Sequence, residues 1–291
     1  MTLESYFAAA VRRALTPFSR KSAIWRVAPL VNHENHSLKG IGLALRDTAS
    51  GLATDEERKS IDEIEQRRKS LLESKEMIEV IDFGAGAPDS KRTELEMSRG
   101  VRSFQEVGRV CRVSKPMFWS TFMFHLVRRL RPKSCVELGT AVGISASYLA
   151  SALQLNGEGR LSTLEGSPGI AEVAQETVHA LGLQNVSLVV GPFHQTLSSA
   201  LDEAEPVDFL FNDGHHDRNA VLRYFDLCQA SLAPEAVILI DDINWSAGMR
   251  EAWAEVTRDD RSTYTIDLGV MGVVVKLDRV RKREHFRIPL F

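Results

Sequence analysis

From residue 134 onward, short apolar runs alternate with amphipathic stretches. The runs are typical of buried strands, and the stretches between the first five are typical of helices. Such alternation predicts a parallel sheet covered on both faces, and the short turn at 269–272 predicts an antiparallel terminal hairpin. We expect an α/β, doubly wound, Rossmann-like sheet of seven strands, five parallel plus the hairpin. The expected strands are SCVEL, RLSTLE, VSLVVG, VDFLFND, AVILIDD, YTIDLG and MGVVVKL.

The first 112 residues have a mainly helical pattern. Thr54 with Glu57 predicts a capping box and a charged helix to about residue 75. Further helices are expected at about 101–112 and 116–130. The basic residues 5–30 fit a helix docked on its own domain, or an amphipathic surface or targeting helix. We therefore divide the chain into an N-terminal helical extension or lid, 1–112, and a sheet domain, 113–291.

Composition narrows the classes of function. The 291 residues are 44% hydrophobic and 26% charged, which is typical of a globular protein. A net charge of −3 does not favour a nucleic-acid partner, and no apolar run reaches the ~18 residues of a membrane span. The cysteines are odd in number and widely spaced (Cys111, Cys135, Cys228), which favours a reducing, cytoplasmic location over a disulfide framework.

The turn after the first expected strand is a candidate ligand loop. It contains Gly139 for a tight turn, followed by Thr140, and Gly143 lets the next helix start close to a ligand. Ser145 adds a hydroxyl. Glu137 would repel a pyrophosphate and attract an ammonium group, which favours S-adenosylmethionine over NAD.

The second and third strands supply further candidate cofactor contacts. Glu165 ends the second strand, where a carboxylate accepts both ribose hydroxyls. After the third strand, Gly191 and His194 belong to a loop expected beside the adenine. Phe193 in that loop is either a stacking residue or core. The glycine turn at 82–86 lacks a following apolar helix, so we interpret it as a turn or lid over the site.

Three acids follow the fourth and fifth strands. Asp213 ends one strand, and Asp241 and Asp242 end the next, so the three carboxylates should meet at one edge of the sheet with the amide of Asn244. Mg²⁺ would relieve their repulsion. His215 and His216 follow Asp213, and either is a candidate base. The alternative is that both histidines cap the helix after the strand and that the aspartates only bond loop amides.

Together, these motifs resemble those of a known enzyme family. Residues of about 115–278 resemble class I S-adenosylmethionine-dependent methyltransferases of the catechol and sugar O-methyltransferase-like branch. The resemblance implies that Glu137, Gly139 and Ser145 hold the methionine end and Glu165 the ribose. It also implies that Asp213, Asp241 and Asp242 bind Mg²⁺ in metal-dependent members, and that Asp213 contributes to both catalysis and cofactor binding. His215 and His216 stand where the two branches place an acidic base and a lysine base, respectively.

The expected activity is O-methylation of a small-molecule hydroxyl, with a homodimer through the N-terminal helices. Trp245 and either Phe118 or Trp119 are candidate walls of the acceptor pocket. Two alternatives stay open from the sequence: a non-catalytic cofactor-binding or scaffold protein, and an NAD(P)-binding oxidoreductase.

Overall fold

The computed structural model describes residues 24–84, 86, 92–279 and 282–290. The expected basic helix at 5–30 lies mostly outside these residues. The central sheet contains eight described strands in the order β10-β8-β9-β7-β6-β3-β4-β5. They are β3 (Ser134–Leu138), β4 (Arg160–Glu165), β5 (Val186–Val190), β6 (Val207–Asn212), β7 (Leu232–Ile240), β8 (Tyr264–Asp267), β9 (Gly272–Leu277) and β10 (Glu284–Arg287).

The seven expected strands are all present, and the α/β fold is confirmed. Strands β3 to β7 are parallel to their neighbours in that group, and β9 runs antiparallel to both β7 and β8. The expected number of strands was wrong, because β10 adds an eighth, parallel to β8. Its four residues follow a basic segment, and Ile288 and Leu290 just beyond it are buried in the core.

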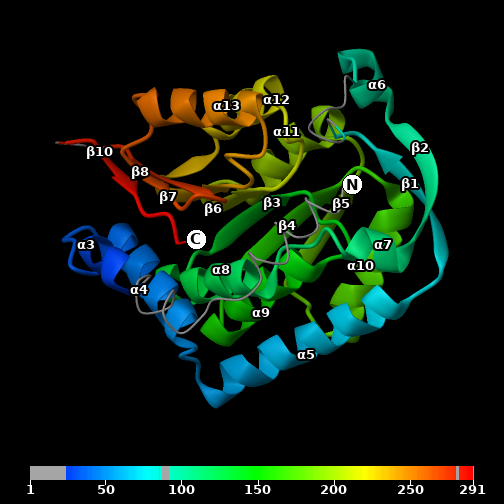
Figure 1. Cartoon of the computed structure of the whole chain (residues 1–291), viewed down its shortest axis with the longest axis horizontal. Coiled ribbons are helices and arrows are strands. Elements are labelled where there is room, and N and C mark those ends of the chain that lie inside the picture. Colours follow the sequence, from blue (N-terminus) through cyan, green and yellow to red (C-terminus); the bar gives the residue numbers. More distant parts are fainter. Residues whose placement is uncertain (1–23, 85, 87–91, 280–281, 291) are drawn as a thin grey trace.

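Helices cover both faces of the sheet, which Figure 1 shows nearly edge-on. One face packs against α11 (Phe193–Ala204), α12 (Arg218–Cys228) and α13 (Ala247–Arg258). The other packs against α8 (Met117–Leu130), α9 (Ile144–Asn156) and α10 (Pro168–Ala180). Alternate residues of one strand serve the two cores: Val136 and Leu138 face the first, and Cys135 faces the second.

The N-terminal helices form a further layer outside α8 and α9 (Figure 1). These are α3 (Ala28–Val31), α4 (His36–Ser50) and α5 (Asp55–Glu73). Helix α4 packs on α8 and α5 packs on α9. The capping box of Thr54 and Glu57 is confirmed. One hydrophobic core runs from Val27 to Leu290, so it contains residues from both sides of the expected boundary at 112, which stays a prediction.

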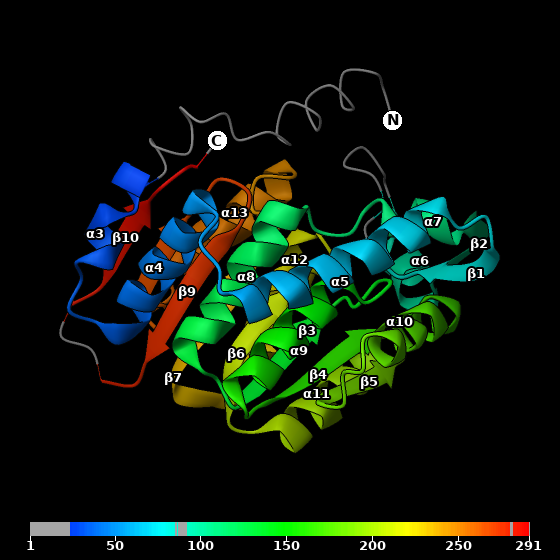
Figure 2. The same ribbon diagram turned by 90° about the horizontal axis from the view of Figure 1, so that it is seen from below.

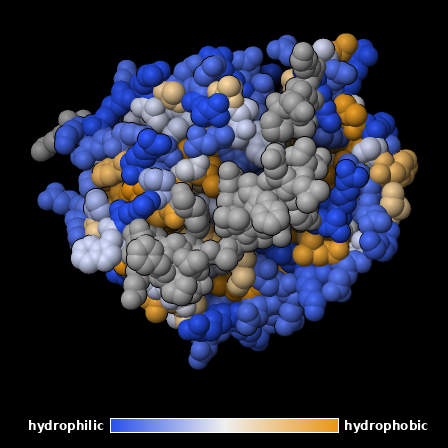
Figure 3. All heavy atoms as spheres, viewed as in Figure 1, coloured by the Kyte–Doolittle hydropathy of each residue, from blue (hydrophilic) through white to orange (hydrophobic). Residues whose placement is uncertain are grey.

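The extension is less helical than expected. Residues 101–106, expected in a helix, form β2 (Val101–Glu106), which pairs antiparallel with β1 (Met77–Asp82). Short helices α6 (Glu94–Arg99) and α7 (Val107–Cys111) flank β2. This hairpin lies beside α10, at the opposite end of the molecule from β10 (Figure 2). The described part of the face in Figure 3 is largely hydrophilic, with hydrophobic groups scattered on both sides of it.

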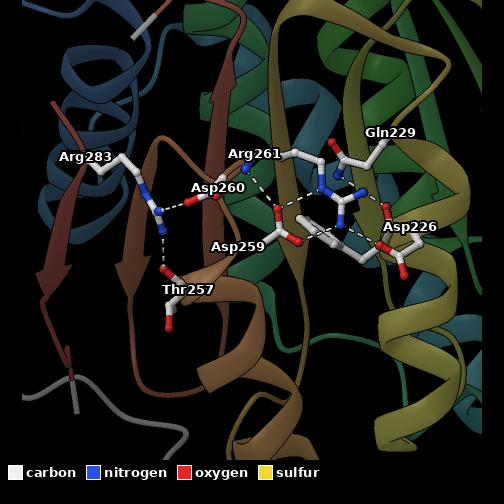
Figure 4. A network of polar contacts seen from close by, with 8 residues as sticks. Asp226, Gln229, Thr257, Asp259, Asp260, Arg261 and Arg283 are labelled. Atoms are coloured by element: carbon white, nitrogen blue, oxygen red, sulfur yellow. Dashed lines mark hydrogen bonds and ion pairs between the residues drawn. The ribbon is translucent and has the colours of Figure 1, made fainter. Parts of the chain in front are cut away.

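Surface ion pairs connect α12 and the end of α13 to the chain that follows them. Arg261 bonds Asp226 of α12 at 2.5 Å and Asp259 at 2.6 Å, and its guanidinium lies 5.3 Å from the centre of the Phe225 ring (Figure 4). Arg283 bonds Asp260 at 2.6 Å. These contacts lie among exposed groups and are structural. In the described ranges, no helix is both long and apolar enough to cross a bilayer.

Candidate active site

Glu137 lies in β3, one residue before its end, with a fully buried side chain. Its Oε2 accepts a hydrogen bond of 2.6 Å from the Thr163 hydroxyl, which also lies 2.6 Å from the hydroxyl of Thr140. Burial raises the pKa of Glu137 to about 7, although hydrogen bonds from Ser145 and Thr163 act to lower it. Thr163 was not predicted. The signal for it was its place in β4, directly beside Glu137 in the register of the two strands.

Gly139 allows the ends of two strands to approach each other. It has a φ of +96°, and a Cβ there would lie 2.8 Å from the carbonyl oxygen of Asp213. Gly143 precedes α9 with a φ of +84°, and a Cβ there would lie 3.3 Å from Ala174 of α10. This glycine therefore allows close packing of helices as well as the turn, a reason that the sequence did not reveal.

Glu165 ends β4 beside this turn. Its Oε2 accepts from the backbone N–H of Ala141 at 2.9 Å, and its Oε1 accepts from that of Ser167 at 3.0 Å. Burial raises its pKa to about 7 against these hydrogen bonds. Among the largest influences on the pKa of Glu137 or Glu165 there is no described cationic side chain. The two acids are thus buried close together with spare acceptor capacity.

The loop after β5 begins beside Glu165. The N–H of Gly191 donates to the Glu165 carbonyl at 2.9 Å, which places this loop next to the second acid. His194 is exposed in the first turn of α11. Phe193 is core: its ring lies 5.9 Å from His215 and 5.6 Å from Tyr224, centre to centre.

Phe83, in the glycine turn that follows β1, lies beside this site. A Cβ on Gly166 would come within 2.6 Å of the Phe83 ring, so this ring packs directly beyond Glu165. The backbone of Phe83 also forms a hydrogen bond with His215. The hairpin therefore connects the ends of β4 and β6 across the end of β3 that lies between them.

Strained turns concentrate at this edge of the sheet. Four non-glycine residues of the described chain have a positive φ, and three of them follow β3, β6 and β7: Ala141, His215 and Asp242. Backbone strain of this kind clusters at ligand sites in proteins.

Asp213 and Asp241 converge next to the cofactor loop, as predicted, but a lysine lies between them. Lys115 Nζ is hydrogen-bonded to Asp241 Oδ2 and lies 3.5 Å from Asp213 Oδ1. The Asp241 side chain is fully buried, and that of Lys115 is 9% exposed. Burial raises the pKa of Asp213, while Lys115 and His216 act to lower it. Lys115 was not predicted to belong to the site. Its only signal was a Lys-Pro pair before an apolar helix.

The predicted metal site has the right donors and an extra cation. Ligand atoms of Asp213, His216 and Asp241 lie within 4.8 Å of one another, which suits a metal ion. Asp242 is not in this group: its Oδ2 lies 3.9 Å from His216 Nε2. With the Lys115 ammonium already paired to the buried Asp241 and to the partly exposed Asp213, this arrangement does not fit a divalent cation, because the two positive charges would repel each other.

The two histidines point to different surroundings. His216 Nε2 lies 3.7 Å from Asp213 Oδ1, so this ring faces the acids. His215 Nδ1 instead lies 2.8 Å from the Tyr224 hydroxyl, and burial lowers its pKa. The structure therefore brings His216, and not His215, to the carboxylates.

Of the other residues predicted on the acceptor side, one lies beside the acids and the rest do not. Trp245 is 47% exposed, and its ring centre lies 6.4 Å from that of His216, so it borders the acids. The amide of Asn244 donates to the Gly269 carbonyl at 2.6 Å and does not join them. Trp119 is buried in the core, and Phe118 packs against it edge-to-face.

Residues 136–243 match the family described as "Methyltransferase domain". This match covers the turn after β3, both buried glutamates and all three aspartates. This part of the chain is therefore similar to methyltransferase domains. The match begins after Lys115, which is contributed by the preceding segment.

Two curated proteins are similar to part of this chain. A catechol O-methyltransferase of Niastella koreensis is 33% identical over 124 residues, which are 42% of this chain and 54% of that protein. An O-methyltransferase of Aspergillus flavus is 32% identical over 117 residues, which are 38% and 45%. The chain thus spans about half the length of the curated relatives it matches.

A solved structure supports the same fold. An SAH-bound methyltransferase of Podospora anserina superposes with a TM-score of 0.51 at 19% identity, over 58% of this chain and 82% of that one. At this identity the likeness shows the fold alone. The Rossmann-like arrangement inferred from the sequence is confirmed.

Proposed function

We propose that this protein is an S-adenosylmethionine-dependent methyltransferase that methylates a hydroxyl group of a small molecule. The observation that carries the proposal is a pair of acids on adjacent strands around the turn at Gly139: the fully buried Glu137 and the partly buried Glu165. Their raised pKa values make them costly for the ligand-free protein. A ligand with one ammonium group and a pair of hydroxyls repays this cost.

The residues of the turn fit such a ligand. Glu137 pairs with the ammonium of the methionine end, with Ser145 and Thr140 beside it. Glu165 accepts the ribose hydroxyls while the N–H groups of Ala141 and Ser167 hold its orientation. Gly191 begins the loop on the adenine side, where His194 is exposed. When bound, S-adenosylmethionine supplies an activated methyl group, so the protein mainly positions the acceptor and excludes water.

The acceptor lies on the side of Asp213, between His216 and Trp245. His216 takes the proton of the attacking hydroxyl at Nε2, the nitrogen that faces Asp213. Asp213, whose Oδ1 lies 3.7 Å from this nitrogen, stabilises the imidazolium that forms, and Trp245 covers one side of the pocket. Bound S-adenosylmethionine would supply the methyl group, and the residues of this chain would hold the acceptor oxygen and take its proton.

The similarity to catechol and other O-methyltransferases supports a hydroxyl acceptor. The magnesium assistance expected from the sequence is not part of this proposal, because the Lys115 ammonium lies against Asp213 and Asp241. The homodimer through the N-terminal helices and the lid role of residues 1–112 stay predictions. The acceptor is a small molecule rather than nucleic acid, in keeping with the net charge of −3.

Calorimetric titration with SAH and, separately, with NAD tests the cofactor. We expect micromolar binding of SAH and none of NAD. Transfer of a labelled methyl group to a panel of catechols, simple phenols and sugars then tests catalysis. Binding of NAD in place of SAH would refute the proposal, and SAH binding without transfer to any acceptor would favour a non-catalytic scaffold.

A further inference from the structure

Lys115 belongs to the site although it precedes residues 136–243, which match the family. Its ammonium group is paired with Asp241 and lies 3.5 Å from Asp213, 126 and 98 residues further along the chain. Both aspartates end parallel strands next to each other, β6 and β7. The lysine side chain is 9% exposed, so water does not screen these contacts as it does on the surface.

Three helices hold the backbone at Lys115. Its carbonyl oxygen accepts from Arg68 of α5 at 2.8 Å and from Ser120 of α8 at 3.3 Å. Arg68 in turn bonds Glu65 at 2.9 Å, and Glu65 accepts from the Tyr148 hydroxyl of α9 at 2.7 Å. Lys115 therefore belongs to a fixed corner of the fold and is not a surface chain that folds over by chance.

The Lys115 ammonium lies where a metal ion bound by these carboxylates would lie. Asp213, His216 and Asp241 have ligand atoms within 4.8 Å of one another, and Lys115 contacts two of these three residues. An ammonium and a divalent cation cannot share the same two oxygens, since both need them and they repel each other.

We propose that Lys115 is the permanent cation of the acceptor site, in place of a divalent metal ion. It neutralises part of the charge of Asp213 and Asp241 and fixes their side chains, which makes it a positioning residue for the acceptor side. This proposal rests on the proposed function for its meaning in catalysis, but the cation assignment itself is independent of methyl transfer.

The test is titration of the full chain with Mn²⁺, followed by calorimetry and by the electron paramagnetic resonance signal of free Mn²⁺. The wild-type protein should show no site tighter than ~1 mM. Lys115→Ala should gain a site at least ~10-fold tighter, because it removes the repelling ammonium and releases Asp241 Oδ2, beside an Oδ1 that no described residue bonds. Adding Asp241→Ala to this variant should abolish the gain. Lys59→Ala, which removes a 78% exposed ammonium from α5, should leave Mn²⁺ binding unchanged.

Two results would overturn the proposal. One is a micromolar Mn²⁺ site in the wild-type protein that is lost in Asp241→Ala. The other is a folded Lys115→Ala variant with no gain over the wild type. Lys115→Arg, which keeps the charge, should bind no more Mn²⁺ than the wild type, and a gain there would also count against the proposal. If SAH fails to bind while the Mn²⁺ results hold, the proposed function fails and the assignment of Lys115 stands.

Discussion

The edge of the sheet carries two pairs of acids that differ in whether the chain supplies a cation beside them. At the cofactor end, Glu137 and Glu165 have raised pKa values of about 7 and no described cation among the main influences on them. At the acceptor end, Asp213 and Asp241 are paired with Lys115. The difference indicates that Glu137 and Glu165 obtain their positive charge and hydroxyl donors from a bound ligand. The negative charges of Asp213 and Asp241 are instead already balanced in part by Lys115.

The largest effect should follow from breaking the compensated pair. Asp241→Ala leaves the Lys115 ammonium buried without its main partner, so we expect a loss of ~3–5 kcal/mol in the free energy of unfolding. Methyl transfer should be abolished, while SAH binding to the remaining folded protein is retained. Denaturant unfolding and calorimetry measure the two quantities.

Asp260→Ala is the matched control for this change. It also removes one carboxylate from an ion pair, with Arg283, but the Asp260 side chain is 99% exposed (Figure 4). Its cost should be below ~1 kcal/mol. Equal losses for the two variants would show that the contact with Lys115 has no special weight.

Replacing the histidine that faces the acids should affect turnover and spare the cofactor. We expect His216→Gln to lower kcat by ~10²-fold or more with little change in SAH affinity, because the imidazole takes the acceptor proton. His215→Gln is the control, since His215 is bonded to Tyr224 and should affect stability more than kcat. A larger loss of kcat in the His215 variant would reverse the assignment of the two residues.

Replacing Glu165, which has no described cation beside it, should weaken cofactor binding and leave the acceptor side of the site unchanged. Glu165→Gln keeps the shape of the side chain but weakens the ribose contact, so SAH should bind ~10-fold more weakly. Glu176→Gln on α10, where the side chain is 72% exposed, is the control and should have no effect. Unchanged affinity in the Glu165 variant would remove this residue from the cofactor site.

The smallest expected effect is a pH dependence of SAH affinity. Binding of an ammonium group requires ionised Glu137, whose pKa in the ligand-free protein is about 7. Affinity should therefore fall as pH drops below 7, by up to ~10-fold per pH unit, and Glu137→Gln should flatten this slope. The sign for stability is opposite. Because the folded pKa of this acid lies above its ordinary value of 4.5, its burial costs more stability as pH rises from about 4.5 to 7.

The sequence predicted the elements whose pattern is local. Strands β3 to β9 were predicted because buried strands in this class form continuous apolar runs, and their acidic ends were predicted because carboxylates directly follow those runs. Topology then brought Asp213 and Asp241 together as expected. The hairpin strand 101–106 was mistaken for a helix because Val101, Phe104 and Val107 also fit a spacing of three.

Lys115 shows what the sequence cannot supply. Its role depends on contacts with residues far along the chain and on a backbone position set by Arg68 of a separate helix. No local periodicity encodes either. The same holds for Phe83, whose glycine turn was identified but whose contact with Gly166 beside Glu165 depends on how β1 packs against α10.

Calorimetric titration of the wild-type protein with SAH, in EDTA and again in excess Mg²⁺, tests the central contrast most directly. We expect micromolar binding with the same affinity in both solutions. Glu137 and Glu165 have no described cation among the main influences on them, whereas Asp213 and Asp241 are already paired with Lys115. Absence of SAH binding would contradict the cofactor site, and binding that requires Mg²⁺ would contradict the role of Lys115.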